Sequence, residues 1–191
     1  RYAVSVDLSK YFDTLNHELL MNLLHKQIQD MRVLSLIKKY LKSGVMENGV
    51  VCKTEEGSPQ GGPLSPLLAN IYLNEFDWEM NNRGVKLVRY ADDIVVFAKS
   101  KRAAERQLES CRKYLEGRLR LKMNTEKSKV TSVFAQKDFK FLGFCLGKNG
   151  NGVYIRAHRK SLNKAKEKLK LLTKRNRGRN VRSVKIGRAH V

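Results

Sequence analysis

The sequence predicts an α+β protein in which an antiparallel or mixed β-sheet is covered by helices on one face. Short runs of β-forming residues alternate with segments whose apolar residues recur at helical spacing. At least twice, two strand-like runs are separated by only a few residues, which is typical of hairpins. In chain order, the expected elements are a strand at 2–6, a helix capped by Asn16, a helix at 33–42, a strand at 50–52, a helix at 67–82, strands at 86–90 and 94–98, a helix at 101–118, strands at 129–135, 139–146 and 153–155, and a helix at 161–173.

Capping and breaking residues set the expected helix boundaries. Asn16 is a suitable N-cap for the leucine-rich stretch after it, and Gly44 comes just after the second helix. Residues 57–66 contain three glycines and three prolines, so they form neither a helix nor a central strand. Ser65 and Pro66 at the end of this loop are a good N-cap and first residue for the long helix.

Composition favours a folded protein with a polyanionic partner. Hydrophobic residues make up 41% of the 191 residues, which is enough for a core and excludes a disordered chain. The 39 Lys and Arg residues against 18 Asp and Glu residues give a net charge of +21, which favours binding to nucleic acid. No run of 18 uninterrupted apolar residues is present, so no membrane association is expected.

The three cysteines, Cys52, Cys111 and Cys145, are widely spaced and match no zinc or CxxC pattern. We expect them to be reduced thiols in an intracellular protein.

Two adjacent carboxylates, Asp92 and Asp93, lie between the strand-like runs 86–90 and 94–98. They are open to two interpretations, a solvated turn or one half of a divalent-metal site, because like charges repel unless a cation or water screens them. Asp7 ends the first strand and could supply a further carboxylate if that strand paired with the hairpin. Such hard oxygen ligands suit Mg²⁺ or Mn²⁺, and two ions about 3.5–4 Å apart would clamp an in-line phosphoryl transfer.

Five segments, in this order and at this spacing, carry a family resemblance. They are Asp7-x-x-x-x-Phe12-Asp13, GSPQGGPLSPLLANIYL at 57–73, Tyr90-Ala91-Asp92-Asp93, Leu121-x-x-Asn124-x-Glu126-Lys127-Ser128-Lys129, and Phe141-Leu142-Gly143-Phe144. Together they resemble the palm of group II intron-encoded reverse transcriptases, also called maturases, over roughly residues 1–172. The resemblance implies a palm sheet of ferredoxin-like type, with a basic thumb helix after it.

The resemblance also implies a metal site. Asp7 and Asp92 would be the principal ligands, with Asp93 as the third carboxylate and the backbone carbonyl of Leu8 completing the shell of one ion. The family uses two Mg²⁺ ions, for which Mn²⁺ can substitute. The expected activity is nucleotidyl transfer that adds dNTPs to a DNA primer on an RNA template.

A nucleotide site is implied around these carboxylates. Phe12 corresponds to the aromatic residue beneath the incoming sugar, where a flat apolar ring excludes a 2′-hydroxyl. Gln60 and the backbone around Gly61 would contact the nucleotide or the template base, and Lys127 or Lys129 would lie near the pyrophosphate leaving group. The full expected set is Lys10, Tyr11, Phe12, Gln60, Gly61 and Lys129.

Two further elements would hold nucleic acid. Phe141, Leu142 and Gly143 match the primer grip, the hairpin that holds the primer terminus. Residues 156–191 contain 14 Lys and Arg but one acid, so we expect a palm at 1–156 and the truncated start of a thumb or maturase region at 157–191. The basic side chains expected on the nucleic-acid backbone are Arg159, Lys160, Lys164 and Lys168.

Three functions remain open. The first is an RNA-directed DNA polymerase of a group II intron, which acts on intron RNA and supports intron mobility and splicing. The second is an RNA-binding maturase in which polymerase activity is secondary or lost. The third is the reverse transcriptase of a retron, a CRISPR-associated system or a diversity-generating element.

The ends of the chain suggest a fragment. Residue 1 opens directly on a strand, so we expect fingers before it and the remaining thumb, the maturase region and any endonuclease after residue 191. The isolated fragment is then expected to polymerise little, and apolar surface left by the missing parts favours a homodimer. The expected location is the bacterial cytoplasm, in association with the nucleoid or a ribonucleoprotein.

Overall fold

A four-stranded antiparallel sheet forms the centre of the molecule. The computed structural model describes residues 1–43, 45–47, 50–52, 56–58, 62–134 and 139–174. The sheet has the order β4-β5-β1-β6, and every neighbouring pair is antiparallel. Its strands are β1 (Tyr2–Val6), β4 (Lys86–Tyr90), β5 (Asp93–Ala98) and β6 (Lys129–Ser132). Of the two predicted pairing patterns, the antiparallel one is therefore observed.

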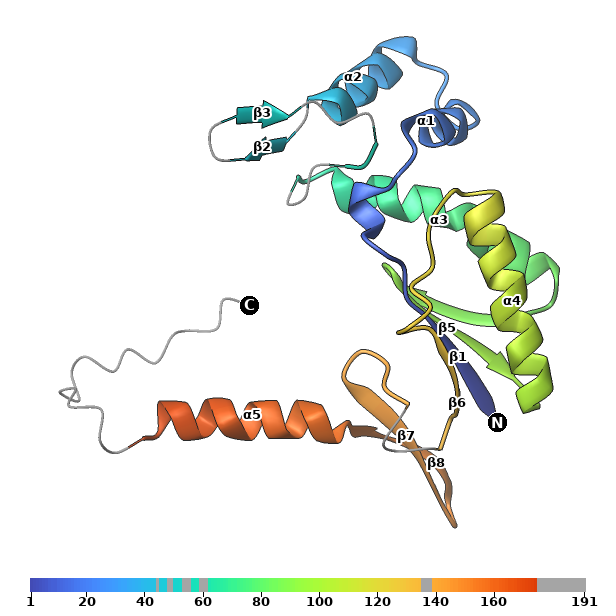
Figure 1. The fold of residues 1–191 in the computed structure, drawn as a ribbon, viewed down its shortest axis with the longest axis vertical. Helices are drawn as coiled ribbons and strands as arrows, with labels where there is room; N and C mark the ends of the chain where they lie inside the picture. Colours follow the sequence, from blue (N-terminus) through green and yellow to red (C-terminus); the bar gives the residue numbers. More distant parts are fainter. Residues whose placement is uncertain (44, 48–49, 53–55, 59–61, 135–138, 175–191) are drawn as a thin grey trace.

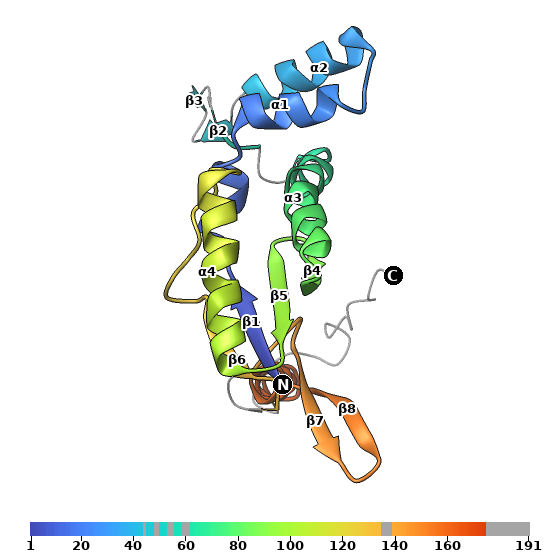
Figure 2. The same ribbon diagram turned by 90° about the vertical axis from the view of Figure 1, so that its right-hand side faces the viewer.

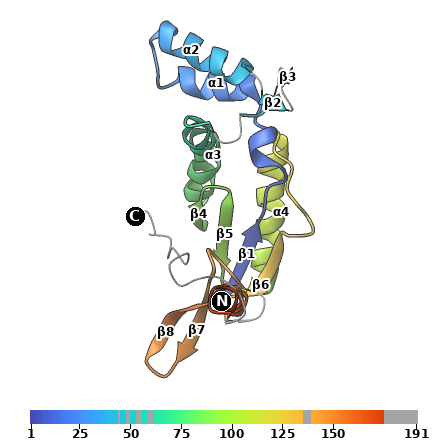
Figure 3. The same ribbon diagram turned by 90° about the vertical axis from the view of Figure 1, so that its left-hand side faces the viewer.

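Two helices connect these strands in the order of a ferredoxin-like fold. Helix α3 (Ser65–Asn82) precedes β4, and α4 (Lys101–Gly117) joins β5 to β6. The resulting β-α-β-β-α-β order confirms the predicted fold class. Both helices pack on the same face of the sheet (Figures 2 and 3), as the sequence analysis expected.

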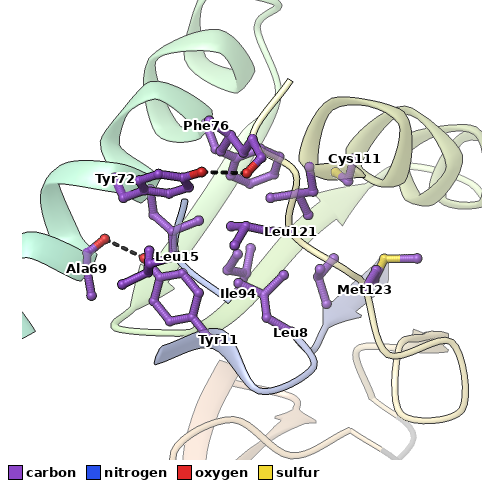
Figure 4. Close-up of a cluster of buried hydrophobic side chains, with 14 of the residues drawn as sticks. Leu8, Tyr11, Leu15, Ala69, Tyr72, Phe76, Ile94, Cys111, Leu121 and Met123 are labelled. Atoms are coloured by element: carbon purple, nitrogen blue, oxygen red, sulfur yellow. Dashed lines mark hydrogen bonds between the residues drawn. The ribbon is translucent and has the colours of Figure 1, made fainter. Parts of the chain in front are cut away.

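The core lies between that face and the helices. Alternation along the strands points Val4 and Val6 of β1, and Ile94 and Val96 of β5, towards the helices, where all four are buried. The helices contribute their own apolar stripes to the same cluster (Figure 4). Those stripes comprise Leu68, Ala69, Tyr72, Leu73, Phe76 and Met80 of α3, and Ala104, Cys111 and Leu115 of α4.

Buried tyrosines connect this core by hydrogen bonds as well as by packing. The Tyr72 hydroxyl donates to the Leu119 carbonyl over 2.6 Å, and both groups are inside the core. Burial raises the pKa of Tyr72 to about 12, so the hydroxyl stays protonated and remains a donor.

The opposite face of the sheet carries a smaller apolar cluster. Ala3, Val95, Val133 and Phe139 are buried there. The hairpin of β7 (Phe144–Asn149) and β8 (Gly152–Ala157) extends from this region, beyond one end of the sheet (Figure 1). Asn149 pairs with Gly152, so the reversal falls within the glycine-rich turn predicted between these strands.

The remaining elements lie at the other end of the sheet (Figure 1). These elements are the 3₁₀ helix η1 (Tyr11–Asp13), helices α1 (His17–His25) and α2 (Met31–Lys42), and the short strands β2 (Val45–Glu47) and β3 (Val50–Cys52). The side chain of Asn16 caps α1 by accepting a hydrogen bond from the Leu19 amide, which confirms the predicted cap. Asp30 caps α2 in the same way.

Several boundaries differ from those expected, and two of the differences can be traced to particular contacts. Helix α3 already includes Ser65 and has Leu64 at its N-cap, because the Ser65 hydroxyl is engaged by Ser58 and Tyr40 instead of capping the helix. The strand expected at 139–146 begins only at Phe144, because a tight turn occupies the preceding residues.

Helix α5 (Arg159–Leu172) leaves the body of the protein as a separate rod (Figure 1). The ring of His158 caps its first turn by accepting from the Lys160 amide, and no residue of the helix is buried. The domain boundary predicted at 156/157 falls at the end of β8, immediately before this helix. Within the described residues, no helix combines the length and apolar character needed to cross a bilayer.

We predict that Tyr72→Phe lowers the free energy of unfolding by about 1–3 kcal/mol, because it leaves the buried Leu119 carbonyl without its donor. Chemical denaturation monitored by circular dichroism measures the change. Tyr154→Phe is the matched control, since Tyr154 lies at the surface of β8. Equal stability of the Tyr72 variant and the wild type would contradict the prediction.

Candidate active site

Strand pairing brings the three predicted carboxylates to one edge of the sheet. Val6 of β1 lies opposite Ile94 of β5, so the next residue along, Asp7, meets the β4–β5 turn that carries Asp92 and Asp93. Asp92 and Asp7 lie close enough to Asp93 to affect its carboxyl group electrostatically. The pKa of the Asp93 carboxyl is raised by partial burial first, and then by the negative charges of Asp92 and Asp7.

The turn that presents these acids is tight and strained. Tyr90 pairs with Asp93, which leaves Ala91 and Asp92 as the only two loop residues. Ala91 has a φ of 54°, in the left-handed region that residues with a Cβ rarely adopt. Strain of this kind persists only where the surrounding structure enforces it.

Arg89 is the residue that holds this turn against α3. Its guanidinium forms a two-pronged ion pair with Asp77, with Nη2 donating to Oδ2 over 2.5 Å and Nε donating over 2.9 Å. Its Nη1 donates to Asn70 Oδ1 over 2.8 Å and to the Ala91 carbonyl over 2.9 Å. Only 11% of the Arg89 side chain is exposed.

Asp7 is held through its backbone. The Asp7 amide donates to Ser128 Oγ over 3.0 Å, and the Asp7 carbonyl accepts from the Asn124 amide over 2.9 Å. These bonds are on the β6 side of the strand. Because successive carbonyls of an extended strand alternate in direction, the Leu8 carbonyl lies on the side that faces β5 and the aspartate turn.

A lysine lies beside this site. Lys127 Nζ is 3.8 Å from Asp7 Oδ1, and Asn124 shapes the turn that presents it by accepting from the amides of Glu126 and Lys127. Lys129 is exposed in β6, opposite Ser5 of β1. Of the two lysines considered for the leaving group, Lys127 is therefore the one in contact with a carboxylate.

The carboxylates of Asp7, Asp92 and Asp93 suit a hard divalent cation, although their side chains do not converge on a single point. Carboxylate oxygens at an exposed edge are the ligands that Mg²⁺ prefers. Within the described part of the chain, no three Asp, Glu, His or Cys side chains are placed so that they could hold a metal ion. The negative charges of Asp92 and Asp7 therefore act on Asp93, while the three side chains are not assembled as a ligand shell.

The predicted nucleotide-binding residues that follow β1 differ in how exposed they are. Lys10 is exposed and has a φ of 47° at the start of η1. Phe12 is half-buried, with its ring 5.4 Å from that of Tyr11.

Tyr11 was expected at the nucleotide, but its side chain lies in the core. It donates to the Ala69 carbonyl of α3, and burial raises its pKa far above the ordinary value (Figure 4).

The loop that contains Gln60 is fixed at both sides, while Gln60 and Gly61 themselves lie outside the described residues. On one side, the Gly57 and Ser58 amides donate to the carbonyls of Leu15 and Phe12 over 2.7 Å. Gly57 has a φ of 88°, and a Cβ there would lie 2.8 Å from the Asp13 carbonyl oxygen, so only glycine fits.

On the other side of that loop, Ser65 Oγ accepts a hydrogen bond of 2.7 Å from the Ser58 hydroxyl. The Tyr40 hydroxyl lies 3.0 Å from the same Ser65 oxygen. A Cβ on Gly62 would collide with the Tyr40 hydroxyl.

The predicted primer-grip residues form a tight turn. Phe141 and Phe144 exchange two backbone hydrogen bonds of 2.9 and 2.8 Å, and the loop residues between them, Leu142 and Gly143, both have positive φ. This is the geometry of a type I′ turn, with Leu142 exposed at its tip. The Gly143 carbonyl accepts from the His158 amide and from Ser161 Oγ, which joins the turn to the start of α5.

The predicted backbone-binding side chains lie on α5. Arg159, Lys160, Lys164 and Lys168 are all exposed, and the three lysines are spaced four residues apart along the helix. This spacing places the three lysines along one side of the rod.

A sheet of ferredoxin-like order with a carboxylate edge is the arrangement expected of a polymerase palm. The chain belongs to the family described as reverse transcriptase (RNA-dependent DNA polymerase), whose model matches residues 1–146. Protein YkfC of Escherichia coli K12 is 38% identical over an alignment of 177 residues, and the match covers 75% of this chain and 46% of that protein. The group II intron-encoded protein LtrA of Lactococcus lactis is 36% identical over 137 residues, which cover 72% of this chain and 22% of that protein.

These matches confirm the predicted family. This chain spans less than half the length of these relatives. Solved structures agree on the fold. Apo telomerase of Candida tropicalis superposes with a TM-score of 0.64 at 13% identity, covering 84% of this chain and 33% of that one.

Sequence reasoning missed the residues that position the carboxylates. Arg89 and Asp77 were not singled out, and Ser128 was noted only as part of a motif. A signal was available for Arg89, because strand alternation places it on the same side as Leu87, which packs against the core. An arginine that points inwards requires a carboxylate partner.

We predict that Gly57→Ala destabilises the protein by about 2–4 kcal/mol, because it combines backbone strain with a steric clash. Gly84→Ala separates the two effects, since Gly84 has a φ of 69° but open space around it, and it should cost about 1–2 kcal/mol. Urea unfolding of both variants measures the difference. Equal losses would show that the Gly57 contact with Asp13 is unimportant.

Proposed function

We propose that this chain is the palm of an RNA-directed DNA polymerase encoded by a group II intron, which extends a DNA 3′-OH on an RNA template with dNTPs. The convergence of Asp7, Asp92 and Asp93 at one sheet edge is the observation that carries the proposal. Family membership and the likeness to LtrA, whose name describes a group II intron-encoded protein, support it.

We propose Asp7, Asp92, Asp93 and the Leu8 carbonyl as the ligands of divalent ions. Bound there, two Mg²⁺ ions, or Mn²⁺ in their place, would neutralise the carboxylates and polarise the phosphate of the incoming nucleotide. The protein's own contribution is positional. Its sheet holds like charges at one edge, and Lys127 sets a positive charge beside Asp7.

Neighbouring residues would bind and orient the nucleotide. Phe12 lies half-buried on η1, two residues after the exposed Lys10, and its ring would exclude a 2′-hydroxyl. Gly57 and Gly62 anchor the segments on either side of Gln60 and Gly61, which we assign to the nucleotide or the template base. The turn at Leu142 would contact the primer.

We predict that Asp92→Asn in the full-length protein lowers primer extension by at least about 100-fold, because it removes a charge from the carboxylate set. Binding to template RNA should stay nearly unchanged, as Asp92 is acidic and adds nothing to phosphate affinity. Extension of a labelled DNA primer on RNA, with filter binding in parallel, measures both. Glu116→Gln, which removes a charge from the exposed side of α4, is the control and should extend normally.

Unchanged extension by Asp92→Asn would refute the polymerase assignment. A splicing assay with the same variant addresses the second candidate function, a maturase that acts through RNA binding alone. That candidate is favoured by one observation, the exposed basic helix α5, and predicts that the Asp92 variant still supports splicing.

We predict that replacing Lys160, Lys164 and Lys168 by Gln weakens RNA binding and lowers the slope of log affinity against log salt by about 2–3, since each phosphate contact contributes about 0.7–0.9. The matched control replaces Lys38, Lys39 and Lys42 of α2, which also carry exposed charges. Fluorescence anisotropy at several salt concentrations measures the slope. An equal effect of the two triple variants would mean that only net charge matters.

A further inference from the structure

We propose that Arg89 is a positioning residue for the reaction, which fixes the peptide that carries Asp92 by joining it to helix α3. The inference rests on the proposed polymerase function. It adds an assignment for a side chain whose hydrogen bonds go to Asp77, Asn70 and the Ala91 carbonyl, and not to the carboxylates of Asp7, Asp92 and Asp93. Asn70 is its partner in this role.

The first argument is the target of the guanidinium. Arg89 Nη1 donates to the Ala91 carbonyl over 2.9 Å, and this carbonyl belongs to the peptide unit that leads into Asp92. Ala91 is the loop residue with a φ of 54°. A strained peptide tends to rotate towards a relaxed conformation, and rotation here would redirect the Asp92 side chain. The bond from Arg89 opposes that rotation.

The second argument is that the guanidinium is itself anchored to α3 by hydrogen bonds. Nε and Nη2 are held by both oxygens of Asp77, and the second Nη1 hydrogen bond goes to Asn70 Oδ1. Asp77 and Asn70 lie seven residues apart on α3, about two helical turns. The planar guanidinium is thus bonded to Asp77 and Asn70 on α3 and to the Ala91 carbonyl in the turn. Because its donors are fixed relative to one another, movement of the turn would break the bond to Ala91.

The third argument is that the same part of α3 also holds the Asp7 segment. The Tyr11 hydroxyl, four residues after Asp7, donates to the carbonyl of Ala69, the residue next to Asn70. Ala69 and Asn70 thus connect α3 to both chain segments that carry carboxylates. The helix sets the distance between these segments, and Arg89 makes the connection on the side of the aspartate turn.

The test compares Arg89→Lys with Arg83→Lys in the full-length protein. Lysine keeps the charge but has a single nitrogen, which cannot satisfy Asp77, Asn70 and Ala91 together. Arg83 is the matched control, because it also pairs with an acidic residue of α3 (Glu79) but lies away from the turn. For Arg89→Lys we expect kcat for single-nucleotide addition to fall about 10- to 100-fold, with KM for the dNTP within about twofold.

A second readout does not depend on polymerisation. Hydrogen exchange of the segment 88–94 should become faster in Arg89→Lys, while exchange in α4 stays the same. Asn70→Ala removes one acceptor from an exposed position, so it folds even if the Arg89 variant does not, and it should show a smaller change in the same direction. Arg83→Lys should change neither measurement.

Normal kcat and normal exchange at 88–94 in Arg89→Lys and Asn70→Ala would overturn the proposal. So would a loss of kcat that accompanies faster exchange throughout the protein, because that result defines a purely structural role. If the wild-type protein adds no nucleotide under any condition, the polymerase assignment fails, and the exchange experiment still decides whether Arg89 holds the turn.

Discussion

The antiparallel register between β1 and β5 is the constraint on which the rest of the structure depends. It pairs residues about ninety positions apart in the chain, and it places Asp7 beside the turn of Asp92 and Asp93. Three carboxylates repel one another, so their proximity must be enforced by other interactions. The core supplies them, because a slip of β1 by one residue would turn Val4 and Val6 away from the helices.

Much of the fold was predictable from the sequence because its elements are locally consistent. Asn16 caps a helix, and the β-forming runs beside Asp92 and Asp93 form the hairpin that their spacing indicates. The candidate carboxylates could be named for a similar reason, since strand ends and turn tips are visible in the pattern. Their convergence could not be derived from local pattern, because it depends on a pairing between distant strands.

Other features depended on tertiary contacts that the sequence does not display. Ser65 has the properties of a helix cap, but Ser58 and Tyr40 engage its hydroxyl, and Leu64 is the N-cap while Ser65 is the first residue of the helix. Tyr11 belongs to a motif associated with nucleotides, yet its ring fills the core. A motif identifies residues that matter together, and only the packing distinguishes those that face a ligand from those that hold the backbone.

Among the residues that the structure describes, helix α5 is tied to the body of the protein at its first turn. None of its residues is buried, and the Gly143 carbonyl fastens only its first turn. A helix of 14 residues with no buried side chain gains little stability from packing and is marginal in water, and lysines four residues apart repel one another along it. Any polyanion that neutralises this row also favours the helical state, so the order of α5 and its occupancy by nucleic acid are thermodynamically coupled.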